Sequence, residues 1–226
     1  TQACVEQVEL AIDKFGGAEI VYSDPAIALG NTNFAPQVSQ MEEAGVQMVA
    51  SCLDSNAVLA VGEEMLKQDV DASQMLFIGY DPSVIEAFGD ELEGAWAMTT
   101  FTPFEVDQPS DGLTAFLDAI EESGGPVNEF SLSGWVAADL LIAGLEGAGP
   151  DFSRASVIEA INAMTDYSAD GIVSEQDWSL IHDEPGPESC VVFSEVVDGA
   201  LTPRFGEPGR PFSCFEVDTD VLPESP

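Results

Sequence analysis

Polar and aromatic residues stand at or directly after the ends of three apolar segments, which cover residues 46–52, 75–78 and 95–101. The residues in question are Asp54, Ser55, Asn56, Tyr80, Asp81 and Phe101. Together they offer carboxylates, hydroxyls, an amide and aromatic rings, which suits a small amphipathic ligand that carries an amino group. The set therefore predicts a binding site in which Asp54 or Asp81 faces an ammonium group and aromatic rings flank an aliphatic part.

The apolar segments decide where these residues lie. Each segment has the length and composition of a strand that is buried on both faces, as in a parallel sheet. The carboxyl ends of parallel strands meet at one edge of the sheet, and open α/β sheets hold their ligands there. We therefore expect the three turns to emerge side by side at that edge.

A second role is open for the acidic residues in these turns. Asp54 or Ser55 could cap the helix that follows, and Asp81 could cap the next one, with Pro82 in its first turn. Capping and ligand binding are compatible roles, because a helix start also offers free N–H groups to a ligand carboxylate. The sequence leaves both roles open.

Sequence motifs for catalysis are missing. The chain contains no GxSxG elbow, no Walker-type loop and no GxGxxG loop. Its only histidine, His182, stands in the turn-like stretch HDEPG, where we expect a solvated loop residue. No nucleophile–base set is visible, so the sequence predicts a protein that binds a ligand without catalysis and without a cofactor.

Four cysteines are present, Cys4, Cys52, Cys190 and Cys214, and none lies in a CxxC pair. Structural zinc is therefore poorly supported. No stretch has the compact DxDxDG spacing of a calcium loop, so we expect no metal site. The even number of cysteines favours two disulfides. Cys190 and Cys214 flank a predicted hairpin, which favours that pair and leaves Cys4 with Cys52, although four cysteines allow three pairings.

Acidic residues dominate the charge, with 42 Asp and Glu against 5 Lys and Arg in 226 residues, a formal net charge of −37. Such a surface repels nucleic acid and anionic lipid, so we expect no nucleic-acid partner. The acids are scattered along the chain, which favours a solvating surface over one binding tail. No apolar run is as long as a bilayer span. No signal segment opens the sequence, so it belongs to a cytosolic protein or to a mature or truncated form of an exported one.

Strands and helices alternate through the first hundred residues. Apolar residues repeat at helical spacing in residues 5–15, and residues 18–22 have the composition of a strand. Together with the three apolar segments this makes four strands, which implies parallel βαβ units with right-handed crossovers. No strand precedes the first helix, so we infer that an upstream segment is missing from this sequence.

The pattern changes after the third apolar segment. Helices then follow one another with little strand between them, and a boundary is expected near residues 124–129. One long helix should end near Gly147, and Asp151 or Ser153 should cap the next. Strands return in residues 191–205, which read as a hairpin.

Four stretches of the chain, taken in order, resemble type I periplasmic binding proteins. They are GGAEIVYSDP, FAPQVSQMEEAGVQMVASCLDSNAVLAVGEEML, MLFIGYDPSVIEAFGDELEGAW and GWVAADLLIAGLEGAG. The match is to the branched-chain amino-acid class, which serves ABC transporters. The resemblance covers nearly all of this chain, but only about the later half of the family's usual length. It implies an extracytoplasmic protein that captures a small ligand between two lobes and passes it to a membrane permease.

The resemblance also implies a division of the chain. Residues 1–127 should form most of the second lobe, without its first strand, in an α/β fold with a parallel sheet flanked by helices. Residues 128–185 should be the helical return to the first lobe, and residues 186–226 the C-terminal hairpin and tail on the hinge side. In the family, the second lobe contributes ligand residues from the turns that match residues 53–56 and 80–81. The first-lobe turns that grip the ligand carboxylate are absent from this sequence.

Two function classes remain open at this point. The first is a solute-binding protein that captures an amino-acid-like ligand for an ABC transporter. The second is a ligand-sensing or interaction domain of the same fold, without transport. An enzyme is a distant third, because no catalytic set is visible.

Overall fold

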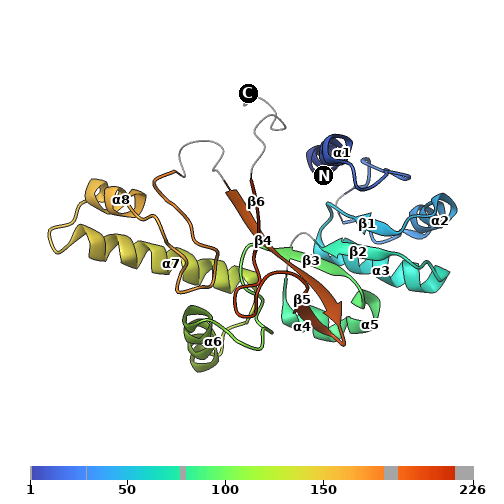
Figure 1. Ribbon diagram of the computed structural model, residues 1–226. Coiled ribbons are helices and arrows are strands. Elements are labelled where there is room, and N and C mark those ends of the chain that lie inside the picture. Colours follow the sequence, from blue (N-terminus) through green and yellow to red (C-terminus); the bar gives the residue numbers. More distant parts are fainter. Residues whose placement is uncertain (1, 29, 77–79, 181–187, 217–226) are drawn as a thin grey trace.

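The computed structural model describes residues 2–28, 30–76, 80–180 and 188–216, and it contains one sheet with helices around it (Figure 1). In chain order the strands are β1 (Met48–Ala50), β2 (Ser73–Leu76), β3 (Trp96–Thr99), β4 (Glu188–Val197), β5 (Ala200–Pro203) and β6 (Ser213–Glu216). The sheet order is β1-β2-β3-β4-β5, and β6 pairs with the first half of β4. The first three strands are parallel, whereas β4 is antiparallel to each of its neighbours. The expected α/β class, with a parallel sheet flanked by helices, is confirmed.

Side-chain caps explain where several of the described helices begin. The described helices are α1 (Gln2–Phe15), α2 (Ala35–Ala44), α3 (Ser55–Gln68), α4 (Pro82–Ala87), α5 (Gly89–Leu92), α6 (Asp111–Ser123), α7 (Glu129–Ala148) and α8 (Arg154–Asn162). The side chains of Ser110, Asn128 and Ser153 accept hydrogen bonds from first-turn N–H groups of α6, α7 and α8. Ser153, and not Asp151, is therefore the cap for which the sequence left two candidates.

Four parallel strands were expected, and the prediction of one of them, in residues 18–22, is wrong because these residues form no strand. A strand needs a partner for its backbone hydrogen bonds. Among the described residues, no strand pairs with residues 18–22 or with the outer side of β1. Ile20 and Val21 are 40% and 47% exposed, so these apolar side chains gain little from burial. A strand-like composition does not produce a strand when the pairing and packing partners are missing.

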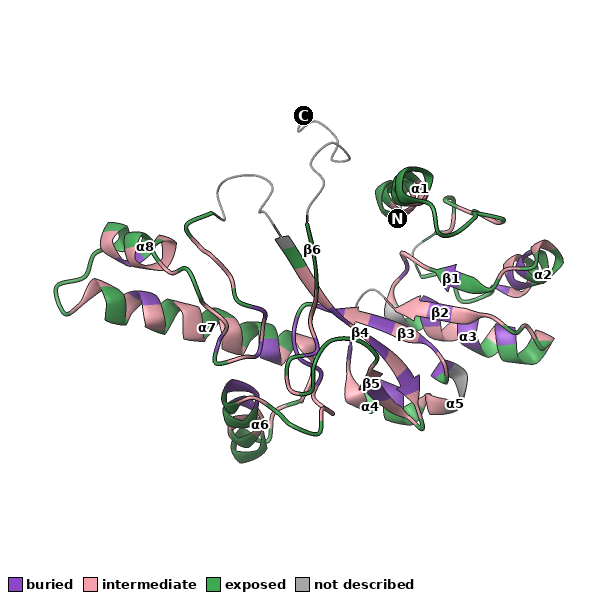
Figure 2. Cartoon of the chain, in the orientation of Figure 1, coloured by how far each residue is buried: buried purple, intermediate pink, exposed green. Residues whose placement is uncertain are grey.

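Buried side chains form two clusters, and α1 takes part in neither (Figure 2). One cluster lies between α2, α3 and β1 and includes Phe34 and Val38. The larger one joins residues that are distant in the chain, among them Tyr80 and Phe116. The helix expected over residues 5–15 is present as α1, but none of its residues is buried and Phe15 is 64% exposed.

Both expected disulfides are present. Cys190 and Cys214 lie opposite each other in the ladder between β4 and β6, so they join two strands that already pair. The bond between Cys4 and Cys52 joins α1 to the turn after β1. It therefore connects the helix without buried residues to the parallel part of the sheet.

The helices α7 and α8 lie side by side at the far end of the molecule from β1 (Figure 1). Gly144 of α7 is buried at this contact, and a Cβ atom there would lie 2.6 Å from Cγ1 of Ile161. A Cβ atom at Gly134, on the same helix, would meet nothing within 4 Å. The glycine at position 144 therefore allows α8 to approach α7 closely.

Replacing Gly144 by Ala should destabilise the protein by about 1–3 kcal/mol, because the added methyl group overlaps Ile161. The matched variant Gly134→Ala should be neutral or stabilising by up to about 1 kcal/mol, since alanine is the better helix former. Urea denaturation followed by circular dichroism would compare the two variants. Equal effects of the two substitutions would contradict a close approach at Gly144.

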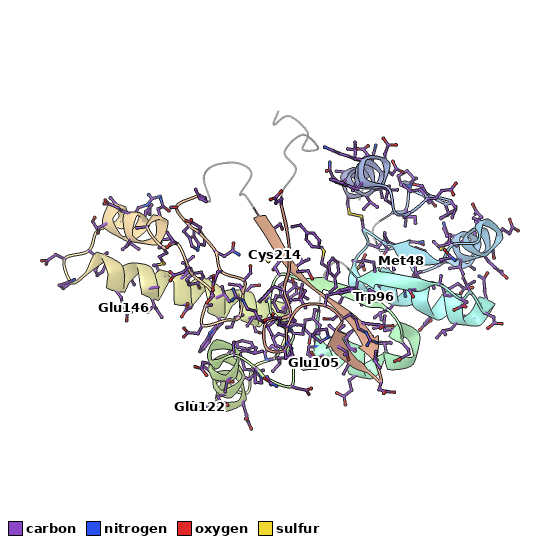
Figure 3. The ribbon with its side chains drawn as sticks, viewed as in Figure 1. Met48, Trp96, Glu105, Glu122, Glu146 and Cys214 are labelled. Carbon is purple, nitrogen blue, oxygen red and sulfur yellow. A yellow bond between two sulfur atoms is a disulfide. The ribbon has the colours of Figure 1, made fainter. Side chains whose placement is uncertain are left out.

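Acidic side chains so outnumber the cations that ion pairs can neutralise only a few of them. In the described part of the chain, ion pairs join Lys67 to Glu63 and Glu64, Arg204 to Glu195, and Arg210 to Glu175. Figure 3 shows Glu122 of α6 and Glu146 of α7 at the outside of the molecule, where both are exposed. The remaining like charges repel one another and disfavour the compact state.

The midpoint of thermal unfolding should therefore rise with NaCl concentration. The rise should be steepest between about 0.01 and about 0.2 M, where the Debye length shortens from about 30 Å to less than 10 Å. Scanning calorimetry at constant pH would measure it, with sucrose as a control that stabilises without screening charge. A midpoint that stays constant over this range of salt would show that self-repulsion is unimportant.

None of the described helices is long and apolar enough to cross a membrane.

Candidate functional site

A cavity lies where the carboxyl ends of β1, β2 and β3 meet the first turns of α3, α4 and α7. It contains about 620 Å³ of space, part of which is open to solvent. Most of its wall is apolar, with Leu59, Ile85 and Leu201 among the lining residues. Its polar members are Ser51, Tyr80, Thr99 and Glu129. The cavity thus opens at the sheet edge where the sequence predicted a binding site.

Asp54 and Asp81 both cap helices in this structure. One Asp54 carboxylate oxygen, Oδ1, accepts hydrogen bonds from the backbone N–H groups of Asn56 (3.1 Å) and Ala57 (3.2 Å) at the start of α3. Asp81 Oδ1 accepts from the N–H (2.9 Å) and the hydroxyl (2.7 Å) of Ser83 at the start of α4. The capping role is therefore confirmed, and neither carboxylate is among the groups that line the cavity.

The other polar residues expected after β1 lie on the first turn of α3. Ser55 is the first residue of that helix, and its side chain is outside the described part of the structure. Asn56 is exposed and offers its backbone N–H to Asp54. The described residues of this turn that reach the cavity are Ser51 and Leu53. Their role as part of the wall was missed, because the prediction selected only the polar side chains of the turn, whereas Ser51 lies in the apolar segment of residues 46–52 and Leu53 is the apolar residue of the turn.

Tyr80 and Phe101 are brought together, as expected, but mainly as packing partners. Both are buried, and their ring centroids lie 6.0 Å apart in a stacked arrangement. Phe104 stacks on Tyr80 at 5.0 Å. Tyr80 also lines the cavity, whereas Phe101 does not. The ring of Tyr80 therefore forms part of the wall, supported from behind by two further aromatic rings.

The hydroxyl group of Tyr80 is fixed by a partly buried acid. It donates a hydrogen bond to Glu105, from the loop after β3, and accepts one from the backbone N–H of Phe104 (3.3 Å). Figure 3 shows Glu105 among the crowded side chains at the centre of the molecule. Burial raises the pKa of the Glu105 carboxyl above its ordinary value, although the hydrogen bond from Tyr80 opposes the shift. Burial and the nearby Glu105 also raise the pKa of Tyr80, so its hydroxyl keeps its proton.

Glu129 is the site residue that sequence reasoning missed. It is the first residue of α7, directly after the cap Asn128. Its Oε2 accepts a hydrogen bond from the backbone N–H of Tyr80 (3.1 Å), and its own N–H donates to the Tyr80 carbonyl (3.1 Å). The Asn-Glu pair signals a helix start. Nothing in the local sequence shows that this helix start lies against a turn 49 residues earlier.

Glu129 is also the one charged residue among the described residues that line the cavity. The five cations of the chain lie elsewhere, at positions 14, 67, 154, 204 and 210. A ligand in this cavity therefore meets a carboxylate and no cation from the described wall. This arrangement favours a ligand group that carries positive charge and donates hydrogen bonds.

Metal binding finds no support in this part of the chain. Among the described residues, no group of three or more His, Cys, Asp or Glu side chains is placed to hold a metal ion. His182, expected to be a solvated loop residue, lies outside the described residues. The remaining chemistry of the site is that of a cavity with apolar walls, hydroxyl groups and one carboxylate.

A family model described as periplasmic binding protein matches residues 1–200, and the chain belongs to this family. A search among curated proteins found no match. The resemblance to periplasmic binding proteins that the four sequence stretches carried is thereby confirmed. Members of the family are solute-binding proteins of ABC transporters.

Solved structures of such proteins share the fold of this chain. A branched-chain amino-acid ABC transporter protein from Thermus thermophilus with bound valine matches with a TM-score of 0.68 and 18% identity, over 88% of this chain and 55% of its own. A solute-binding protein from Rhodopseudomonas palustris in complex with p-hydroxybenzoic acid matches with a TM-score of 0.65 and 20% identity, over 95% of this chain and 58% of its own. A substrate-binding protein of a fatty acid ABC transporter from Thermomonospora curvata matches with a TM-score of 0.67 and 15% identity, over 96% of this chain and 54% of its own. The chain thus spans about half the length of these proteins, whose ligands differ in chemistry.

The raised pKa of Glu105 predicts a specific pH dependence of stability. Between the ordinary carboxyl pKa and this raised value, the folded state binds more protons than the unfolded state. The contribution of Glu105 to stability therefore becomes less favourable as the pH rises through that window. Glutamine resembles the protonated carboxyl, so the unfolding midpoint of Glu105→Gln relative to the natural protein should rise as the pH increases from the ordinary carboxyl pKa through the raised one.

Thermal unfolding across this pH range would measure the difference between the two proteins. Glu122→Gln, at an exposed position on α6, is the matched control and should give a flat difference. A difference for Glu105→Gln that is flat, or that falls with pH, would contradict a raised pKa of the Glu105 carboxyl in the folded protein.

Proposed function

We propose that this chain forms one side of the ligand site of an extracytoplasmic solute-binding protein, which captures a small amino-acid-like solute for an ABC transporter. Membership of the periplasmic binding protein family supports the general role. The observation that carries the ligand class is the cavity at the carboxyl ends of β1, β2 and β3. Its apolar wall suits an aliphatic side chain, and its one carboxylate suits an ammonium group. The family role also leads us to propose a membrane permease as the partner.

The charge of the cavity favours an amino-acid-like ligand over an acid without an amino group. A carboxylate ligand that enters a partly dry site needs a cation or several N–H donors. The described wall supplies no cation, and the carboxylate of Glu129 would repel the ligand. An ammonium group would instead be attracted to it, and the attraction is stronger in a cavity than in water. A solute such as valine therefore fits this wall better than p-hydroxybenzoic acid or a fatty acid.

We further propose ligand-contacting roles for the residues that the sequence singled out. Tyr80 lines the cavity directly. Asp54, Ser55, Asn56 and Asp81 lie on the turns around it, and they would approach a ligand that fills the open side, whereas Phe101 would act through Tyr80, which it supports from behind. In this proposal, residues 1–127 are most of one lobe, residues 128–185 the helical return to the other lobe, and residues 186–226 the C-terminal hairpin and tail. The protein acts by binding and release, without catalysis.

The decisive test is calorimetric titration of the complete product of the gene with L-valine, p-hydroxybenzoate and a fatty acid. We expect L-valine to bind most tightly. Glu129→Gln keeps an acceptor for the Tyr80 N–H but removes the charge, and it should weaken valine binding by about 2–5 kcal/mol. Glu146→Gln, an exposed acid on the same helix, should leave the affinity unchanged.

The same titration separates the two roles of Asp81. Asparagine is as good an N-cap as aspartate, so Asp81→Asn removes the charge without removing the cap. Weaker valine binding by this variant, with an unchanged unfolding midpoint, would add Asp81 to the ammonium site. Tighter binding of p-hydroxybenzoate than of valine, or full affinity in both Glu129→Gln and Asp81→Asn, would refute the proposed ligand class.

A further inference from the structure

The disulfide between Cys4 and Cys52 is the principal connection between α1 and the sheet. None of the residues of α1 is buried, and the helix packs extensively against no other described helix or strand. The hydroxyl of Ser23 donates to Glu9 of α1 (3.0 Å), but Ser23 lies in the irregular segment that follows the helix. Figure 1 shows α1 beyond the β1 edge of the sheet. Its position therefore depends on the covalent bond.

Cys52, the other end of this bond, lies between two residues of the cavity wall. Ser51 precedes it and Leu53 follows it, and both line the cavity. The backbone of residues 51–54 belongs to neither β1 nor α3, although the Asp54 carbonyl accepts the first bond of α3 from Val58 (3.0 Å) and its carboxylate accepts the N–H of Gly30 (3.4 Å). The turn is otherwise held by the burial of Leu53 and by the capping bonds of Asp54. A bond from Cys52 to a helix thus restrains a part of the wall that lies outside the regular elements.

We propose that the Cys4–Cys52 disulfide is a positioning element of the ligand site, which holds the turn of residues 51–54 in place and keeps α1 beside it. The inference rests on the proposed function, since it assigns the role of this turn to ligand capture. An isolated helix of this length is marginal in water. Without the bond, α1 loses its anchor and unfolds, and the turn gains freedom that a ligand must then remove at a cost in affinity.

The second disulfide provides a matched comparison within the same chain. Cys190 and Cys214 face each other in an antiparallel ladder whose backbone hydrogen bonds remain when the sulfur bond is removed. Neither residue lines the cavity. Both disulfides close loops in the unfolded chain, with sequence separations of 48 and 24 residues, so both stabilise through that state. Only the Cys4–Cys52 bond is placed to order the wall of the cavity.

Hydrogen–deuterium exchange read by mass spectrometry tests this without any ligand. In the double variant Cys4→Ser/Cys52→Ser, exchange in α1 and at the N–H groups of Asn56 and Ala57 should speed up by at least about tenfold more than the exchange in β3 and β4, which reports the loss of global stability. In Cys190→Ser/Cys214→Ser, any increase beyond the global one should be confined to β6 and the first half of β4. If the first variant does not fold, reducing the folded second variant with a phosphine opens the Cys4–Cys52 bond alone and gives the same readout.

Two results would overturn the proposal. Faster exchange in α1 with an unchanged turn would show that the bond holds only the helix. A uniform increase over all protected segments would show that it contributes only to global stability. The exchange measurement needs no solute, so it tests the positioning role even if the protein binds no amino acid. Failure of the proposed function would be detected separately, by the calorimetric titration.

Discussion

Two reciprocal hydrogen bonds between Tyr80 and Glu129 hold the site together. Each residue donates its backbone N–H to the other, one to a carboxylate oxygen and one to a carbonyl, both at 3.1 Å. They fix the first turn of α7, the longest described helix, against the turn that follows β2. The cavity obtains its charged side from this contact, because Glu129 comes from a helix that otherwise extends away from the parallel strands (Figure 1).

Aromatic packing makes this junction rigid. The ring of Tyr80 stacks on Phe104 at 5.0 Å, Phe104 stacks on Phe116 at 5.9 Å, and Phe116 meets Trp135 edge-on at 5.9 Å. The chain of rings runs from the turn after β2, through the loop after β3, to α6 and α7. Aromatic pairs in such arrangements add stability beyond the area they bury. A wall that is ordered before binding does not have to be ordered by the ligand, which preserves affinity.

The sequence predicted what depends on local pattern and missed what depends on distant contacts. The strand, turn and cap around Asp81 follow from an apolar run and a proline, so they could be read directly. Residues 18–22 have the composition of a strand, but a strand exists only where a partner offers hydrogen bonds, and composition does not report that. Glu129 could not be found because its role depends on a contact across 49 residues. The burial of Tyr80 and Phe101 against each other is likewise a product of packing.

The helix starts beside the cavity also affect the charge of its surroundings. α3, α4 and α7 all begin at the cavity, and the positive end of a helix dipole normally attracts anions. Here the carboxylates of Asp54 and Asp81 accept first-turn N–H bonds of α3 and α4, whereas Glu129, at the start of α7, accepts the N–H of Tyr80. The N–H groups of Asn56 and Ala57 at α3 and of Ser83 at α4 are thereby occupied, and at α7 the N–H of Ser131 is bound by the cap Asn128. Glu129 on the wall and Asp54 and Asp81 on the neighbouring turns, with no cation on the described wall, give the cavity negative surroundings, which are the basis of the proposed preference for an ammonium group.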